Sequence, residues 1–109
     1  MSIKFYNSYS RKKESFKPIV DGKVGLYTCG PTVYDFAHIG NFRTFLFEDL
    51  LKRWLIHNGY DVTHIMNITD VDDKTITMAK NQNIDLNIIT EKYTEQFMND
   101  LRWLKILPA

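Results

Sequence analysis

The chain has 109 residues, of which 44% are hydrophobic, and its 14 Lys and Arg side chains nearly balance 13 Asp and Glu side chains. This balance excludes a strongly basic nucleic-acid coat and an acidic tail, and the apolar content excludes general disorder. No stretch approaches the roughly 20 apolar residues that span a bilayer, and the first residues lack a signal-peptide pattern. We therefore expect one small domain without a membrane segment, located in the cytoplasm.

Residues 1–23 are rich in basic side chains. Six of them lie there, against Glu14 and Asp21: Lys4, Arg11, Lys12, Lys13, Lys17 and Lys23. The stretch ends in turn signals at Pro18 and at Asp21-Gly22. We expect residues 1–23 to form an arm or a short edge strand that leads into the domain body, residues 24–109.

The domain body opens with a short run of strand-forming residues, 24–29. Gly22 lies before this run and Gly30-Pro31 after it, so the pattern predicts a strand that ends abruptly. Cys29 then lies at the carboxyl end of the strand. It is the single cysteine of the chain, which excludes an internal disulfide and fits a reducing compartment.

A helix is predicted over residues 41–58. Five apolar residues recur there at helical spacing: Phe47, Leu50, Leu51, Trp54 and Leu55. Asn41 is a natural N-cap, and Asn58-Gly59 supplies a C-terminal stop. Residues 61–67 follow as a β-branched-rich run without clean alternation, which is typical of a strand buried on both faces.

Two more helices are predicted after this strand. Asp70, Asp72 and Asp73 could hold a magnesium ion, but we interpret them as caps of a short helix that ends near residues 81–83. The second helix carries an apolar stripe with spacings of 3, 4, 4, 4 and 3: Leu86, Ile89, Tyr93, Phe97, Leu101 and Leu104. Trp54, Trp103 and the phenylalanines are candidates for the core.

The order strand, helix, strand predicts an α/β fold that begins with a right-handed parallel β-α-β unit of the nucleotide-binding type. Two strands leave such a sheet incomplete. Ligands of these sheets bind in the crevice at the carboxyl ends of the strands, where His38, Gly40 and Asn41 precede the helix. Backbone N–H groups there would face an anion, Gly40 would admit a flat base or a phosphate, and Thr44 would lie in the first helical turn.

Three blocks of residues match a known family. His38-Ile39-Gly40-Asn41 resembles the HIGH signature of class I aminoacyl-tRNA synthetases. Together with residues 27–35 (YTCGPTVYD) and 67–74 (NITDVDDK), it resembles the amino-terminal part of the cysteinyl-tRNA synthetase family. The resemblance extends from Lys4 onward and implies the first half of a Rossmann-like catalytic domain over residues 24–109.

The resemblance implies ATP-dependent activation of L-cysteine to cysteinyl-adenylate and transfer to tRNA(Cys) by a monomer, with Mg²⁺ accompanying ATP. His38 and Asn41 take the catalytic positions, and His38 would stabilise charge on the α-phosphate. Gly40 and Thr44 join them in binding ATP and the adenylate. Asn41 replaces the last His of the signature, which keeps an amide donor and loses any positive charge.

Cys29 matches the first zinc ligand of the family, and the other ligands lie outside these residues. Zn²⁺ would bind the substrate sulfur as a thiolate and so distinguish cysteine from serine. By the same resemblance, five residues bind the cysteine substrate: Cys29, Gly30, Thr32, Asn67 and Thr69. His57 and His64 have no metal-ligand partners at suitable spacing, and we interpret both as structural.

Two other functions remain open. The cysteine ligase of mycothiol synthesis shares the zinc cysteine and the signature loop but joins cysteine to an amino sugar. A shortened, non-catalytic nucleotide-binding paralog is the second. The chain has no KMSKS loop and no anticodon-binding domain, so we expect the 109-residue segment to be inactive alone.

Overall fold

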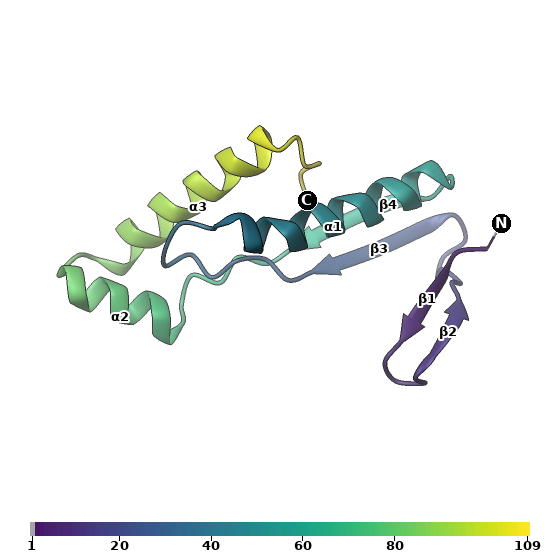
Figure 1. Ribbon diagram of the computed structural model, residues 1–109, viewed down its shortest axis with the longest axis horizontal. Coiled ribbons are helices and arrows are strands. Elements are labelled where there is room, and N and C mark those ends of the chain that lie inside the picture. Colours follow the sequence, from purple (N-terminus) through teal and green to yellow (C-terminus); the bar gives the residue numbers. More distant parts are fainter. Residues whose placement is uncertain (1) are drawn as a thin grey trace.

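The computed structural model describes residues 2–109, which form two small sheets and three helices (Figure 1). In chain order the elements are β1 (Lys4–Asn7), β2 (Lys12–Ser15), β3 (Lys23–Thr28), α1 (Ile39–His57), β4 (Asp61–Met66), α2 (Asp73–Gln82) and α3 (Leu86–Trp103). None of the helices in this part of the chain has the length and hydropathy that crossing a membrane requires.

The predicted β-α-β unit is present. Strands β3 and β4 pair in parallel, with Lys23 opposite Asp61 and Thr28 opposite Met66, and α1 connects them and packs against both. Two strands with one crossover helix make an incomplete α/β sheet, which confirms the predicted fold class.

One detail of the strand prediction is wrong. Tyr27 of β3 is 68% exposed and Ile65 of β4 is 58% exposed, so these strands are not buried on both faces. The reason is geometric: successive side chains of a strand point to opposite faces, and α1 covers one face alone. The absence of apolar–polar alternation in the β4 sequence is therefore no guide to how β4 is buried within this chain.

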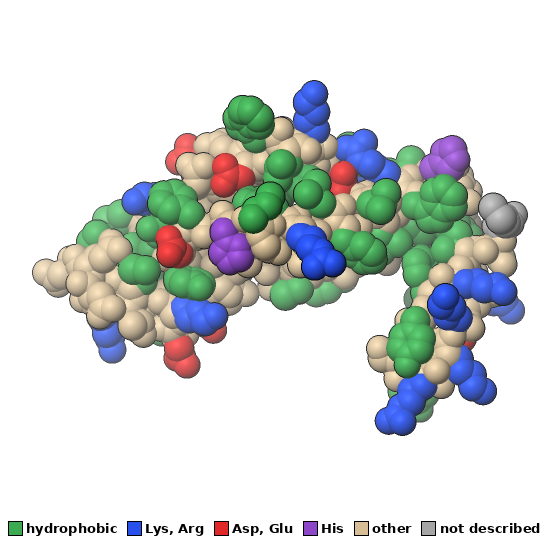
Figure 2. Space-filling model, viewed as in Figure 1, with side chains coloured by type: hydrophobic (Ala, Val, Ile, Leu, Met, Phe, Trp, Pro, Cys, Tyr) green, Lys and Arg blue, Asp and Glu red, His purple; other side chains and the backbone are tan. Residues whose placement is uncertain are grey.

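The amino-terminal stretch is an antiparallel hairpin. β1 pairs with β2, and Arg11 adopts a left-handed conformation (φ 56°) in the turn between them. The hairpin projects from one end of the molecule, and its basic side chains stand out in Figure 2. The ring of Phe16 packs edge-on against Tyr60, 5.7 Å between centroids, and so joins the hairpin to the start of β4.

Helix α1 buries a face that overlaps the predicted one only in part. Phe47, Leu50 and Trp54 of the expected apolar stripe are 65%, 64% and 45% exposed. Leu55 of the stripe is buried as predicted, and the other buried residues of the helix are Phe42, Phe45, Glu48 and Lys52.

Packing against α3 explains this orientation of α1. The rings of Phe42 and Phe45 lie 5.8 and 5.0 Å from the ring of Phe97. Because one helical turn takes about 3.6 residues, fixing Phe42 and Phe45 inward also turns Glu48 and Lys52 inward.

Polar groups therefore lie between α1 and the sheet. Thr28 Oγ1 and His64 Nε2 are 2.8 Å apart and join the two strands through their side chains. Burial lowers the pKa of His64, and the positive charge of Lys52 lowers it further. Burial also raises the pKa of Glu48, an effect that a hydrogen bond from Thr28 opposes.

The remaining helices follow the sequence closely. Asp72 caps α2, with its carboxylate accepting from the backbone of Lys74, as the cap interpretation predicts. In α3, Ile89, Tyr93, Phe97 and Leu101 of the predicted stripe are buried. Trp103 is 86% exposed, so its prediction as a core residue is wrong.

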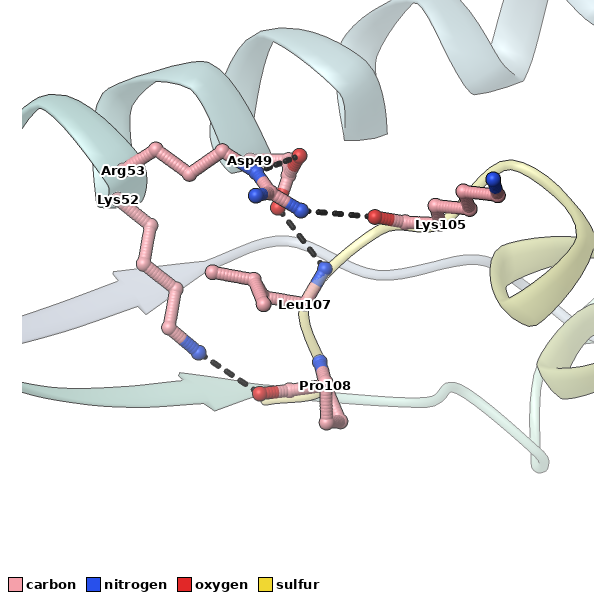
Figure 3. Close-up of polar contacts among 6 residues, drawn as sticks. All are labelled: Asp49, Lys52, Arg53, Lys105, Leu107 and Pro108. Atoms are coloured by element: carbon pink, nitrogen blue, oxygen red, sulfur yellow. Dashed lines mark hydrogen bonds and ion pairs between the residues drawn. The ribbon is translucent and has the colours of Figure 1, made fainter.

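Three charged side chains of α1 hold the segment that follows α3 (Figure 3). Asp49 Oδ1 accepts from the backbone of Leu107 at 2.9 Å, and Lys52 Nζ donates to the carbonyl of Pro108 at 2.7 Å. Arg53 donates to the carbonyl of Lys105 at 2.8 Å and pairs with Asp49 at 2.8 Å. We call Asp49, Lys52 and Arg53 the α1 clamp.

Candidate functional site

The site begins where the two parallel strands end. Beyond β3 and β4 the chain segments continue side by side, with Thr32 opposite Thr69 in a parallel bridge. The backbone of Val33 donates to the carbonyl of Thr69 at 3.1 Å, and the backbone of Thr69 donates to the carbonyl of Pro31 at 2.9 Å. These backbone hydrogen bonds fix the register between the loop after β3 and the loop after β4. The two loops together form one side of the site.

Gly30 is the point of closest approach between the loops. Its N–H donates to Asn67 Oδ1 at 2.9 Å, and Asn67 Nδ2 donates to Thr69 Oγ1 at 3.3 Å. A Cβ atom at Gly30 would lie 1.8 Å from the carbonyl oxygen of Asn67, so no other residue fits there. The structure thus places Asn67 and Thr69 as supports of the Gly30 loop.

Cys29 is the first residue after β3, and its thiol is exposed. Its only polar contact in the described residues is a weak one, from Sγ to the carbonyl of Gly30 at 3.6 Å. Within residues 2–109 no three His, Cys, Asp or Glu side chains form a group that could hold a metal ion. These residues alone therefore make no metal centre, and Cys29 could supply one ligand.

His38 and Asn41 form a reciprocal cap at the start of α1. His38 is the N-cap residue, and its Nδ1 accepts from the N–H of Gly40 at 3.0 Å. Asn41 Oδ1 accepts from the N–H of His38 at 3.0 Å. The prediction of Asn41 as the N-cap is therefore wrong. The imidazole nitrogen of His38 caps the helix, and Asn41 is the third helical residue.

The cap also defines the tautomer of the imidazole. Because Nδ1 of His38 accepts a hydrogen bond, the proton of the neutral ring lies on Nε2. The Nε2–H group is then the donor that His38 can offer to a ligand.

Gly40 and Thr44 also depart in detail from the sequence analysis. A Cβ atom at Gly40 would lie 2.8 Å from Cε1 of His38, so a larger residue there would force the imidazole out of its capping position. Because α1 begins at Ile39, Thr44 lies in the second helical turn and not in the first.

The strand ends and the start of α1 together line a cavity of about 410 Å³. This volume falls within the range of small-molecule sites. Six of the predicted site residues line it: Cys29, Gly30, Thr32, His38, Asn41 and Thr44. Gly40, Asn67 and Thr69 are not among the lining residues; they shape the backbone beside it.

This arrangement combines two chemical capacities. One wall offers an exposed thiol, and another offers the imidazole of His38 and the amino-terminal end of a 19-residue helix, where backbone N–H groups and the helix dipole favour an anion. The helix end can bind an anion such as a phosphate group, and the thiol is a potential metal ligand.

Comparison with known proteins identifies the family of the chain. The family described as tRNA synthetases class I (C) catalytic domain matches residues 15–109. The chain belongs to this family.

Curated relatives within the family carry one name. The chain is 61% identical to Cysteine–tRNA ligase of Chlamydia pneumoniae over 105 residues, which are 96% of this chain and 22% of that protein. It is 56% identical over 107 residues to the ligase of Brachyspira hyodysenteriae, covering 98% of the chain and 23% of the relative. It is 54% identical over 106 residues to the ligase of Solibacter usitatus, covering 97% and 23%. The chain thus spans less than a quarter of the length of these class I ligases.

Some lining residues were not picked as site residues from the sequence, among them Tyr34, Lys74 and Tyr93. Tyr93 lies on α3, and only packing of α3 across the loops brings it to the cavity. Lys74 did carry a signal: it is a cation in the first turn of a helix, where negative charge is favoured.

Proposed function

We propose that this chain forms part of the catalytic domain of a cysteine–tRNA ligase, which activates L-cysteine with ATP and transfers it to tRNA(Cys). In this proposal residues 1–23 are an amino-terminal arm, and residues 24–109 are the first half of the Rossmann-like domain. The ligase acts as a monomer in the cytoplasm, and ATP enters with Mg²⁺.

A single observation carries the proposal: Cys29, His38 and Asn41 open onto the same cavity. A ligase of this kind must hold the side chain of cysteine and the phosphates of ATP close enough for the carboxylate to attack the α-phosphate. The end of β3 and the start of α1 are brought together by the paired loops, and each offers one of the two groups required.

On the nucleotide side, His38 is the residue that touches the reacting phosphate. Its Nε2–H donates to an oxygen of the α-phosphate as negative charge grows there during displacement of pyrophosphate. Asn41 holds the backbone of His38, and the hydroxyl of Thr44 lies one turn further along α1 on the same cavity. Gly40 gives the imidazole room.

On the amino-acid side, Cys29 supplies one zinc ligand, and residues outside this chain supply the others. When bound, Zn²⁺ takes the substrate sulfur as a thiolate, which a serine hydroxyl cannot match. Gly30 and Thr32 form the wall beside the substrate, and Asn67 and Thr69 keep that wall in place.

A chimera tests the proposal. The matching segment of the Chlamydia pneumoniae ligase is replaced by this chain, and cysteine-dependent ATP–pyrophosphate exchange is measured. We expect exchange in the chimera and none from the 109-residue chain alone. A well-folded chimera without exchange would contradict the proposal.

The role of Cys29 is tested in the same chimera. We expect Cys29→Ser to lower the zinc content sharply and to weaken discrimination between cysteine and serine. His38→Gln serves as the matched variant, because it should lower exchange and leave the zinc content unchanged. An unchanged zinc content in Cys29→Ser would show that the ligand is assigned wrongly.

The tRNA product is favoured over the amino-sugar product of a mycothiol-type ligase, because the relatives described above are all named Cysteine–tRNA ligase. The chimera distinguishes the two activities by the molecule that receives the activated cysteine. Charging of tRNA(Cys) supports the proposal.

A further inference from the structure

Lys74 brings a positive charge to the cavity from an element that the signature residues do not include. It lies in the first turn of α2, where its backbone N–H donates to Asp72 Oδ2 at 3.1 Å. Lys74 is one of the residues that line the cavity of His38 and Asn41, and together with Tyr34 it also lines a second hollow on the α2 side. The cavity is therefore bordered by a cation on α2 as well as by the amino-terminal end of α1.

The charge of Lys74 is not neutralised by a neighbouring acid. Within residues 2–109 the one ion pair joins Arg53 to Asp49, so no carboxylate lies within 4.0 Å of the Lys74 ammonium group. Asp35 also lines the cavity, and its Oδ1 accepts from the backbone of Phe36 at 2.7 Å. Among the described residues, the ammonium group is therefore not in an ion pair.

An aromatic ring holds this ammonium group. The Nζ atom of Lys74 lies 5.3 Å from the ring centroid of Tyr34, which lines the cavity too. The face of a tyrosine ring attracts a cation without cancelling its charge. Tyr34 can therefore position Lys74 and leave it free to bind an anion.

Helix stability does not explain a lysine at this position. The first turn of a helix is the positive end of its dipole, so a cation there is unfavourable. Lys80, in the last turn of the same helix, has the favourable placement. A lysine that opposes the stability of its own helix and faces a cavity is better explained by a ligand.

We propose that Lys74 binds a phosphate group of the nucleotide substrate, with the Tyr34 ring holding its ammonium group at the cavity wall. This inference rests on the proposed function, and it adds a cation that binds the phosphate chain. His38 and Lys74 approach the cavity from α1 and α2, so they contact a polyphosphate from two walls.

The test uses the isotopically labelled 109-residue chain and four probes: sodium pyrophosphate, ATP, adenosine and a single-stranded oligonucleotide ending in CCA. Binding is followed by the NMR shifts of the cavity-lining backbone amides. We expect pyrophosphate and ATP to bind, with Lys74→Gln weakening both by about tenfold, as loss of a charged hydrogen bond predicts. Lys74→Arg should restore most of the affinity, and adenosine should bind equally to all variants.

Two controls separate this effect from a change in folding. Lys80→Gln removes a cation from the same helix and should leave the affinity for pyrophosphate unchanged. Tyr34→Phe keeps the ring and should bind like the unsubstituted chain, whereas Tyr34→Leu should lose several-fold in affinity. Lys74→Gln should also melt no lower than the unsubstituted chain, because the lysine opposes the helix dipole.

Three outcomes overturn the inference. The first is absence of pyrophosphate binding at the cavity, and the second is equal affinity in Lys74→Gln and the unsubstituted chain. The third is an effect of Lys74→Gln confined to a single-stranded oligonucleotide ending in CCA, which would assign the lysine to nucleic acid. If the chimera supports exchange while Lys74→Gln binds pyrophosphate normally, the inference fails and the proposed function stands.

Discussion

The backbone N–H of His38 donates to Oδ1 of Asn41 at 3.0 Å, while the imidazole of His38 caps the same helix by accepting from Gly40. The two residues therefore fix each other: Asn41 holds the backbone of His38, and His38 begins the helix that carries Asn41. Asparagine in the last position of the signature consequently has a structural role as a hydrogen-bond acceptor, for which no positive charge is needed.

Substitutions of Asn41 should separate capping from ligand binding. Asn41→Ala leaves the N–H of His38 without its acceptor and should lower the free energy of unfolding by about 1 kcal/mol. Asn41→Asp keeps the acceptor and adds a negative charge at the positive end of α1, which should stabilise the chain by about 0.5 kcal/mol. The same charge should repel phosphate, so Asn41→Asp should bind pyrophosphate more weakly.

Urea unfolding and NMR titration measure these two effects independently. If Asn41→Asp lost both stability and affinity, the hydrogen bond to His38 would not be the main contribution of Asn41.

A pair of glycines tests the close approach of the two loops. A methyl group at Gly30 would overlap the backbone carbonyl of Asn67, so Gly30→Ala must push the loops apart and should cost about 3 kcal/mol. Gly25→Ala is the matched control, because a Cβ atom there meets nothing within 4 Å. It should be neutral or stabilise the chain by about 0.5 kcal/mol. Thermal unfolding of both variants checks this, and equal melting temperatures would contradict the overlap.

The α1 clamp should contribute to stability through Asp49. Asp49→Ala removes the acceptor of the Leu107 N–H and the partner of Arg53, and should lower the free energy of unfolding by about 2 kcal/mol. Asp49→Asn keeps an oxygen for Leu107 and loses only the charge, so its cost should be about half as large. Urea unfolding decides between them; a larger loss in Asp49→Asn than in Asp49→Ala would contradict the clamp.

The elements of the fold follow from local sequence, and their orientation does not. Turn residues and caps locate β3, β4, α2 and α3 to within about two residues, because these signals are local. The buried face of α1 could not be predicted from such local signals. Its choice depends on Phe97, which is distant in sequence and packs on Phe42 and Phe45.

In the candidate site too, some features follow from local sequence and others depend on tertiary packing. Local sequence places Cys29 at a strand end and His38 at a helix start, which is where the cavity lies, whereas the roles expected of them come from the family resemblance of their blocks. The role of His38 as a cap was missed, because histidine is not a preferred capping residue. Lys74 and Tyr34 come together only when the loops and α2 fold over the strand ends, so spacing alone could not pair them.

The buried His64 should make the stability of the chain depend on pH. Burial and the nearby charge of Lys52 lower its pKa in the fold, opposed by Asp49, so the unfolded chain binds the proton more readily. The contribution of His64 is therefore present above about pH 6.5 and is lost as the pH falls through the lower pKa of the folded state. His64→Gln keeps an amide near Thr28, and it should flatten the loss of stability on acidification.

Glu48 lies in the same buried region, and its titration changes stability with pH in the direction opposite to that of His64. It therefore serves as the control. Its pKa is raised by burial, so its ionisation opposes folding as the pH rises through that value, and its protonation offsets part of the His64 effect in acid. Glu48→Gln should thus raise the urea midpoint near neutral pH and steepen the loss of stability on acidification. Parallel pH profiles for the unsubstituted chain, His64→Gln and Glu48→Gln would show that neither buried group controls this dependence.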